Sequence, residues 1–163
     1  MFAFLLGTAV AQKTDTLCLY LKDSSPTNVR EKPANGKIIK TIPHTLTIGI
    51  CVCEARNGWW KIAYNHVYDY DNDTEISLTD SAGEAWVHYS VLAFSTRNYG
   101  NQKITLRKSP DKKAAASWSF GKETELRPLD CKNGWIKVST LDGKHVGWME
   151  MEWVCGNPLT NCC

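Results

Sequence analysis

One short pattern occurs twice in this 163-residue chain, as Asn28-Val29-Arg30-Glu31-Lys32-Pro33 and again as Thr105-Leu106-Arg107-Lys108-Ser109-Pro110. Each copy is followed by Asn-Gly-Trp, and later by a small residue and a second Trp, at Ala85-Trp86 and at Gly147-Trp148. The two arginines lie 77 positions apart, and the glycines of the two Asn-Gly pairs, Gly58 and Gly134, lie 76 apart. Because order and spacing are kept over about half the chain, the sequence predicts one small module written twice.

The segments beside each Asn-Gly pair have the composition of β-strands. An Asn-Gly pair tolerates positive φ angles, which a tight hairpin turn requires. Residues 47–53 before the first pair and 59–64 after it are rich in β-branched and aromatic side chains, and residues 135–139 alternate apolar with polar. Outside the extreme N-terminus no segment keeps a helical period. The sequence therefore predicts an all-β protein.

The three motifs, in the same order and twice over, resemble the bacterial SH3 (SH3b) family of small barrels, which are often found in tandem on secreted and cell-wall proteins. The resemblance covers roughly residues 17 to 155 and implies two tandem SH3-like small barrels. The matching positions are Asn28, Val29, Arg30, Pro33, Asn57, Gly58, Trp59, Ile62, Trp86, Val87 and Leu92, then Leu106, Arg107, Pro110, Asn133, Gly134, Trp135, Val138, Gly147 and Trp148.

The chain also departs from the family pattern. Ala85 stands where the family usually has Gly, and Thr105 stands where it usually has Asn. The second copy ends Met151-Glu152-Trp153-Val154, so we expect its cleft to differ from that of the first copy.

Residues 1–11 are interpreted as a remnant of a signal peptide. They form an apolar run ending in Ala9-Val10-Ala11, a small-x-small pattern typical of signal peptidase sites. The run is too short to span a membrane. We therefore expect an exported protein, periplasmic or extracellular, whose mature chain starts at Gln12.

The mature chain is expected to form two domains, residues 12–94 and residues 95–163. The boundary is placed between Leu92 and Lys103, because residues 95–102 are polar and rich in turn formers.

Barrels of about 70 residues are near the lower limit for a self-sufficient core, so the tryptophans of the repeated motifs are expected to serve mainly as core or groove wall: Trp59, Trp86, Trp135 and Trp148. Three others have no Trp at the corresponding place in the other copy and are expected to be partly exposed: Trp60, Trp118 and Trp153.

The chain has seven cysteines, and export would permit disulfides. Cys51 and Cys53 share one face of a predicted strand and are poorly placed to bridge each other. Cys162-Cys163 follow a Gly-Asn-Pro segment, from which a bridge to Cys155 or to Cys18 is possible. The count is odd, so at least one thiol is left over or pairs between chains, and the sequence does not fix the connectivity.

Charge separates the two copies. Residues 12–92 carry 8 Lys and Arg against 10 Asp and Glu, a net of −2, whereas residues 93–163 carry 11 against 7, a net of +4. The first copy also carries an acidic insertion, residues 65–83, in which we expect the stretch from Asp69 to Glu75 to be an exposed hairpin tip. Such an insertion either adds a function to a repeated scaffold or only packs on the neighbouring barrel.

Neither metal chemistry nor catalysis is indicated. The four His are not set at zinc-ligand spacing with the Cys residues, and the acidic stretch lacks the turn glycine and the distal Glu of a calcium loop. The chain has no GxSxG, HExxH or phosphate-binding Gly loop. We therefore expect no metal, no cofactor and no enzyme activity.

Two functions of different classes follow. The resemblance to SH3b implies a noncatalytic module that recognises cell-wall (peptidoglycan) peptides through shallow aromatic grooves. The alternative is a periplasmic or secreted protein–protein interaction module, an adaptor or inhibitor, that uses the acidic insertion. A pI near 8.1 with mixed signs gives no case for nucleic acid, and we expect a monomer.

The binding residues are expected among exposed aromatic side chains, which give a large contact area at low entropy cost. Trp60 in particular should face opposite to Trp59, on the outer side of its strand. Arg107 and Lys108 are available to meet a ligand carboxylate. The aromatic candidates are Trp60, Tyr64, Trp86 and Tyr89 in the first copy, and Trp118, Trp148 and Trp153 in the second; alternatively, Trp86 and Trp148 only close the barrels.

Overall fold

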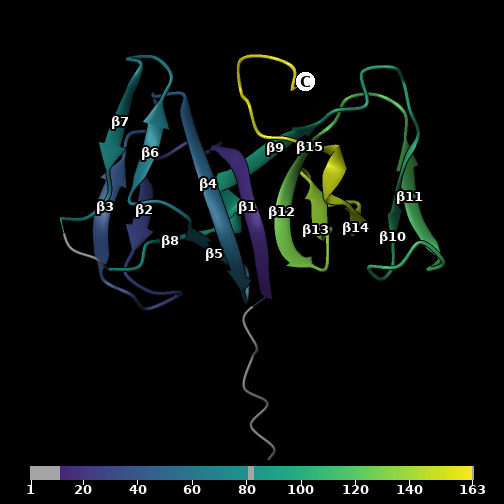
Figure 1. Ribbon diagram of the computed structural model, residues 1–163, viewed down its shortest axis with the longest axis horizontal. Coiled ribbons are helices and arrows are strands. Elements are labelled where there is room, and N and C mark those ends of the chain that lie inside the picture. The colour runs from purple at the N-terminus through teal and green to yellow at the C-terminus, as the bar shows by residue number, and fades with distance from the viewer. Residues whose placement is uncertain (1–11, 81–82, 163) are drawn as a thin grey trace, which may run out of the picture.

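The computed structural model describes residues 12–80 and 83–162 (Figure 1). The proposed signal-peptide remnant and Cys163 lie outside the described residues. Within them the regular structure is β-strand, apart from two 3-10 helices, so the all-β prediction is confirmed. The elements of the first half are β1 (Gln12–Leu21), β2 (Thr27–Arg30), β3 (Ile38–Ile42), β4 (Ile48–Arg56), β5 (Trp59–Ile62), β6 (His66–Asp69), β7 (Thr74–Ser77), β8 (Trp86–His88) and η1 (Tyr89–Val91).

The second half repeats this order without the β6–β7 hairpin. Its elements are β9 (Leu92–Thr96), β10 (Ile104–Arg107), β11 (Ala116–Phe120), β12 (Glu125–Lys132), β13 (Trp135–Thr140), β14 (Val146–Glu150), η2 (Met151–Trp153) and β15 (Val154–Cys155). We call β1 to β9 the first repeat and β9 to β15 the second repeat, because β9 belongs to both.

The strands pair antiparallel into one connected sheet, in the order β11-β10-β14-β13-β12-β9-β1-β4-β5-β8-β2-β3. Strand β9 lies at its middle: Tyr20 of β1 pairs with Ala93, and Leu126 of β12 pairs with Phe94. Figure 1 accordingly shows two β-rich halves that meet at β1, β9 and β12. The stretch 95–102 is thus not all linker, since Ser95 and Thr96 are strand residues of β9.

The two motif arginines occupy matching positions. Arg30 pairs in register with Trp86, and its Nη1 donates to the carbonyl oxygen of Gly36 at 2.7 Å. Arg107 pairs with Trp148, and its Nη1 donates to the carbonyl oxygen of Ala114 at 2.8 Å. Each arginine therefore ties the end of its strand to the turn that follows.

The Asn-Gly pairs form the predicted hairpin turns. Asn57 and Gly58 join β4 to β5, with φ of 50° and 80°. Asn133 and Gly134 join β12 to β13, with φ of 48° and 78°. Positive φ at two successive residues is the geometry that Asn-Gly tolerates at low cost.

The acidic insertion forms the β6–β7 hairpin, which pairs with β4 through β6. Residues 71–75 are exposed at its tip, as expected. Asp69 is an exception, because it is buried and accepts hydrogen bonds from the Asn72 side chain and from the backbone N–H of Asp71 and Asn72. Its carboxylate closes the tight turn, so the expectation that Asp69 is exposed was wrong.

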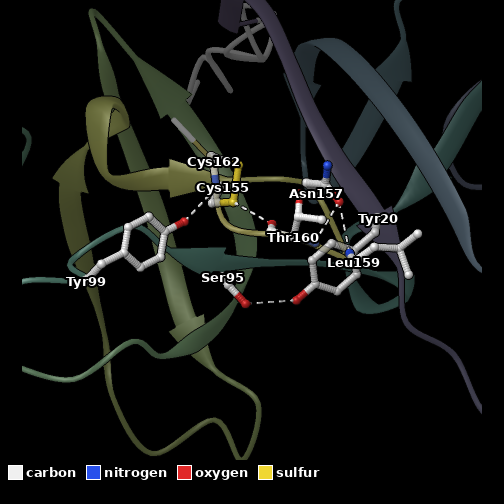
Figure 2. Close-up of a disulfide and its surroundings, with 8 residues drawn as sticks. All are labelled: Tyr20, Ser95, Tyr99, Cys155, Asn157, Leu159, Thr160 and Cys162. Atoms are coloured by element: carbon white, nitrogen blue, oxygen red, sulfur yellow. Dashed lines mark hydrogen bonds between the residues drawn. A yellow bond between two sulfur atoms is a disulfide. The ribbon is translucent and has the colours of Figure 1, made fainter.

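Two disulfides form among the described residues. Cys18 of β1 stands opposite Cys51 of β4 and is bridged to it. Cys155 is bridged to Cys162, one of the two pairings left open by the sequence, and so closes the C-terminal tail into a loop. Figure 2 shows how the loop is held: Tyr99 accepts a hydrogen bond from the backbone N–H of Cys162 at 2.8 Å, and Asn157 caps Leu159 and Thr160. Cys53 and Cys131 take part in neither disulfide.

In the described part of the chain, no helix is long and apolar enough to cross a membrane.

Candidate functional site

A groove of about 200 Å³ opens on the second repeat, between the start of β10 and the 3-10 helix η2. Two tryptophans, Trp135 at the start of β13 and Trp153 at the end of η2, line it together with three basic residues. Met149 and Glu150 close it from β14. The basic residues are Lys103, Arg107 and Lys112; Ile104 and Thr105 complete the lining.

The cations of the groove differ in how they are held. Lys112 Nζ lies 2.8 Å from Glu150 Oε1, and this ion pair raises the pKa of Lys112. Arg107 is fixed by its bond to the Ala114 carbonyl oxygen, which leaves its other guanidinium N–H groups for further acceptors. With one carboxylate against three cations, and two tryptophans in the same lining, the groove has the composition to bind an anionic group.

The hairpin sequence explains why Trp135 faces this groove. It is the first residue after the Asn133-Gly134 turn, and Ile136 and Val138, one and three positions later, are fully buried. Side chains alternate faces along a strand, so Trp135 and Lys137 point away from the core. In register Trp135 stands opposite Glu150, which places both at the groove.

Two predicted binding residues, Arg107 and Trp153, line this groove, and three others of the second repeat do not. Lys108 is exposed beyond the end of β10. Trp148 is half-buried opposite Arg107 in register and is not part of the lining. Trp118 is half-buried and stacks with His145, at 4.2 Å between ring centroids, and with Phe120, at 4.8 Å.

In the first repeat the structure corrects the prediction for Trp60 and, for Trp86, favours the alternative of a buried closing residue over that of a binding residue. Trp60 is fully buried, and its indole N–H donates to the carbonyl oxygen of Pro128 at 3.1 Å. Trp86 is fully buried as well; its indole N–H donates to Glu84 at 3.1 Å, and the Arg56 guanidinium lies 5.1 Å from its ring centroid. Neither ring is accessible to a ligand. The prediction that Trp60 lies on the outer side of its strand was wrong.

The other two candidates of the first repeat are accessible. Tyr64 is 50% exposed and stacks on His66, with 5.6 Å between ring centroids. Tyr89 begins η1 and lies half-buried against His88, whose pKa is lowered by burial. The Trp59 ring meets His88 edge-on at 5.2 Å, so the place that corresponds to the Trp135 groove holds a Trp-His-Tyr cluster here.

The two lysines of the groove, Lys103 and Lys112, were not among the predicted binding residues, and neither was Trp135. Trp135 was expected to be core or groove wall because it belongs to a repeated motif, and the structure places it in the groove wall. Its alternation with the buried Ile136 and Val138 agrees with that position. The two lysines sit in loops that only the fold brings beside Trp135, so no local pattern identifies them.

No family model matches the sequence, and no curated protein matches it. Among solved structures, the structure of NlpC2 from Trichomonas vaginalis aligns with 93% of this chain and 50% of that chain, at 8% sequence identity and a TM-score of 0.33. This chain therefore spans about half the length of that protein. The functional interpretation rests on the groove itself.

Proposed function

We propose that this protein is an exported, noncatalytic binding module that recognises carboxylate-bearing peptides, such as those of the bacterial cell wall, in the groove between Trp135 and Trp153. The observation that carries the proposal is the combination of two indole walls with three basic side chains. Aromatic walls supply contact area, and the basic groups orient a carboxylate between them.

We also propose that each repeat forms one SH3-like small barrel. It is supported by the matched settings of Arg30 and Arg107 and by the 3-10 helices η1 and η2, which precede the closing strands β9 and β15. In this reading the barrels share β9 and act as one monomeric unit. The two disulfides support an oxidising compartment, hence export.

A titration of the chain from Gln12 onward with soluble muropeptides, followed by calorimetry, tests this function. Trp153→Ala and Lys103→Gln should each weaken binding, the first by at least about tenfold, because a Trp at the centre of a site is typically a dominant contact. Lys40→Gln, on β3 of the first repeat, is the matched control and should bind as the parent does. Unchanged affinity in both groove variants would overturn the proposal.

Removing the terminal carboxylate of the peptide is the second arm. An amidated peptide should lose most of its affinity if Lys103, Arg107 and Lys112 recognise that group, and raising the salt concentration should weaken only the carboxylate form. If the amide binds equally well, the groove recognises some other part of the ligand and the assignment of its basic residues is wrong.

A further inference from the structure

A second hollow, of about 160 Å³, lies on the first repeat, over β6, β4 and β1, where β6 pairs with one part of β4 and β1 with the same strand. Its floor includes the Cys18–Cys51 disulfide; Leu19, Ile50 and Val67 border it, but their side chains are buried in the core. Four aromatic side chains surround it: Tyr64, His66, Tyr68 and Tyr70. The hollow is not part of the proposed peptide groove, and no equivalent of the β6–β7 hairpin is present among the described residues of the second repeat.

Two glycines shape the hollow. A Cβ at Gly49 would lie 2.7 Å from the Tyr70 ring, so the ring rests over β4 only because position 49 has no side chain. A Cβ at Gly156, in the C-terminal tail, would lie 1.7 Å from the main-chain oxygen of Cys18. The tail therefore runs directly against β1 and forms one wall. Both glycines line a site that a larger residue at either place would disturb.

Two carboxylates that are not part of the lining contact residues that line the hollow. Glu75 Oε1 lies 3.4 Å from His66 Nε2, and Asp73 accepts a hydrogen bond from the Tyr68 hydroxyl. Both acids belong to the exposed tip of the hairpin. Between Lys61 and Arg97 the chain contains no Lys or Arg, so the hairpin supplies neither of these side chains to neutralise them.

We propose that this hollow binds a lysine or arginine side chain carried on an extended segment of a partner protein. The disulfide and the tyrosine rings suit the aliphatic stem of such a side chain, since Lys and Arg bury their stems while the charge stays in water. The half-exposed Tyr64 ring offers a face for the cation. The Asp73 and Glu75 carboxylates complement the charge, and the volume admits a single long side chain.

Peptide titration of the isotope-labelled chain, monitored by the backbone amide signals in NMR, tests the proposal. The probes are four acetylated and amidated pentapeptides, Gly-Gly-X-Gly-Gly, in which X is arginine, lysine, norleucine or glutamate. The arginine and lysine probes should give saturable shifts at Gly49, Cys51 and His66, and the norleucine probe should bind at least about tenfold more weakly, a difference of about 1.4 kcal/mol. The glutamate probe should not bind.

Variants locate the binding. Tyr64→Ala changes an exposed ring and should weaken the arginine probe at least fivefold, while Glu75→Gln should weaken arginine more than norleucine. Trp153→Ala, in the other groove, is the control and should leave arginine binding unchanged, so this test stands apart from that of the peptide groove. Equal affinity for norleucine and arginine would show an apolar site and overturn the proposal. So would the absence of saturable shifts, or arginine binding retained in Tyr64→Ala.

Discussion

The indole N–H of Trp60 in β5 donates to the main-chain carbonyl oxygen of Pro128 in β12, at 3.1 Å, and so joins the first repeat to the second. Both residues are buried. A second hydrogen bond crosses the same boundary: Tyr20 of β1 donates to Glu125 Oε1 of β12 at 2.6 Å. Arg127 of β12 holds the shared strand β9, since its Nη1 donates to the Leu92 carbonyl oxygen at 3.0 Å. With β9 shared as well, the repeats are bound to each other through core, polar contacts and sheet, and we expect them to unfold as one unit.

Trp60→Phe should therefore destabilise the whole chain. The substitution leaves the buried Pro128 carbonyl oxygen without its donor, which costs about 1–3 kcal/mol, and a phenyl ring fills less of the space. Urea denaturation monitored by circular dichroism should show a single transition at a lower midpoint. Trp153→Phe is the control, since Trp153 is half-buried at the surface groove and its replacement should shift the midpoint much less. Equal shifts in the two variants would contradict the role given to Trp60.

Trp59 and Trp60 also show where sequence reasoning succeeds and where it stops. The strand period correctly placed the two rings on opposite faces, and the Asn57-Gly58 turn was correctly placed before them. Which face is the core depends on what packs against β5. Pro128, 68 positions away, decides that, and no local pattern contains this information.

The same division holds for the site. Arg107 was predicted from its repeated motif and Trp153 from its expected exposure. Lys103 and Lys112 lie in loops that only the fold brings to the groove, so the sequence did not identify them. The repeat predicted matched settings for Arg30 and Arg107, which the structure confirms. The repeat did not predict that β9 would pair with both β1 and β12, because no sequence pattern marks a strand that two repeats share.

Gly147→Ala should destabilise the protein, although the first repeat carries Ala at the corresponding position, Ala85. A Cβ at Gly147 would lie 2.6 Å from Ser117 Oγ, 2.8 Å from Leu106 Cβ and 2.9 Å from the Arg107 carbonyl oxygen. Crowding of this kind costs about 1–3 kcal/mol. The first repeat already carries the methyl group at the corresponding Ala85, so Ala85→Gly is the matched reverse change and should cost about 1 kcal/mol. Thermal melting of both variants measures the two losses of stability. An unchanged melting temperature for Gly147→Ala would contradict the prediction, because it would show that β10 moves aside at no cost.

Cys131 and Cys53 should differ in reactivity. Burial raises the pKa of the Cys131 thiol to about 12, and the charge of Asp130 adds to the shift. Since the thiolate is the reacting species, iodoacetamide at pH 8 should modify the half-buried Cys53 before Cys131. Peptide mass spectrometry over time gives the two rates, and labelling in urea, where both thiols are accessible, is the control. Equal rates in the folded protein would rule out a buried, protonated Cys131.

Tyr20 should make stability depend on pH in the alkaline range. Burial raises the pKa of its phenol above the ordinary value of 10.0, and the hydrogen bond donated to Glu125 raises it further. The folded state thus holds the proton more tightly than the unfolded state. The resulting stabilisation is fully present below pH 10 and is lost progressively as the pH rises through the folded-state pKa, by up to about 1.4 kcal/mol per pH unit.

Tyr20→Phe isolates this contribution. At pH 8 the variant should be less stable by about 1–3 kcal/mol, because Glu125 loses a donor. Above pH 10 the parent loses stability that the variant never had, so the gap between their urea midpoints should narrow. Tyr68, whose pKa is also raised, is present in both proteins, and its effect cancels in the comparison. A gap that stays constant from pH 8 to pH 11 would show that the Tyr20 phenol ionises alike in the folded and unfolded chain.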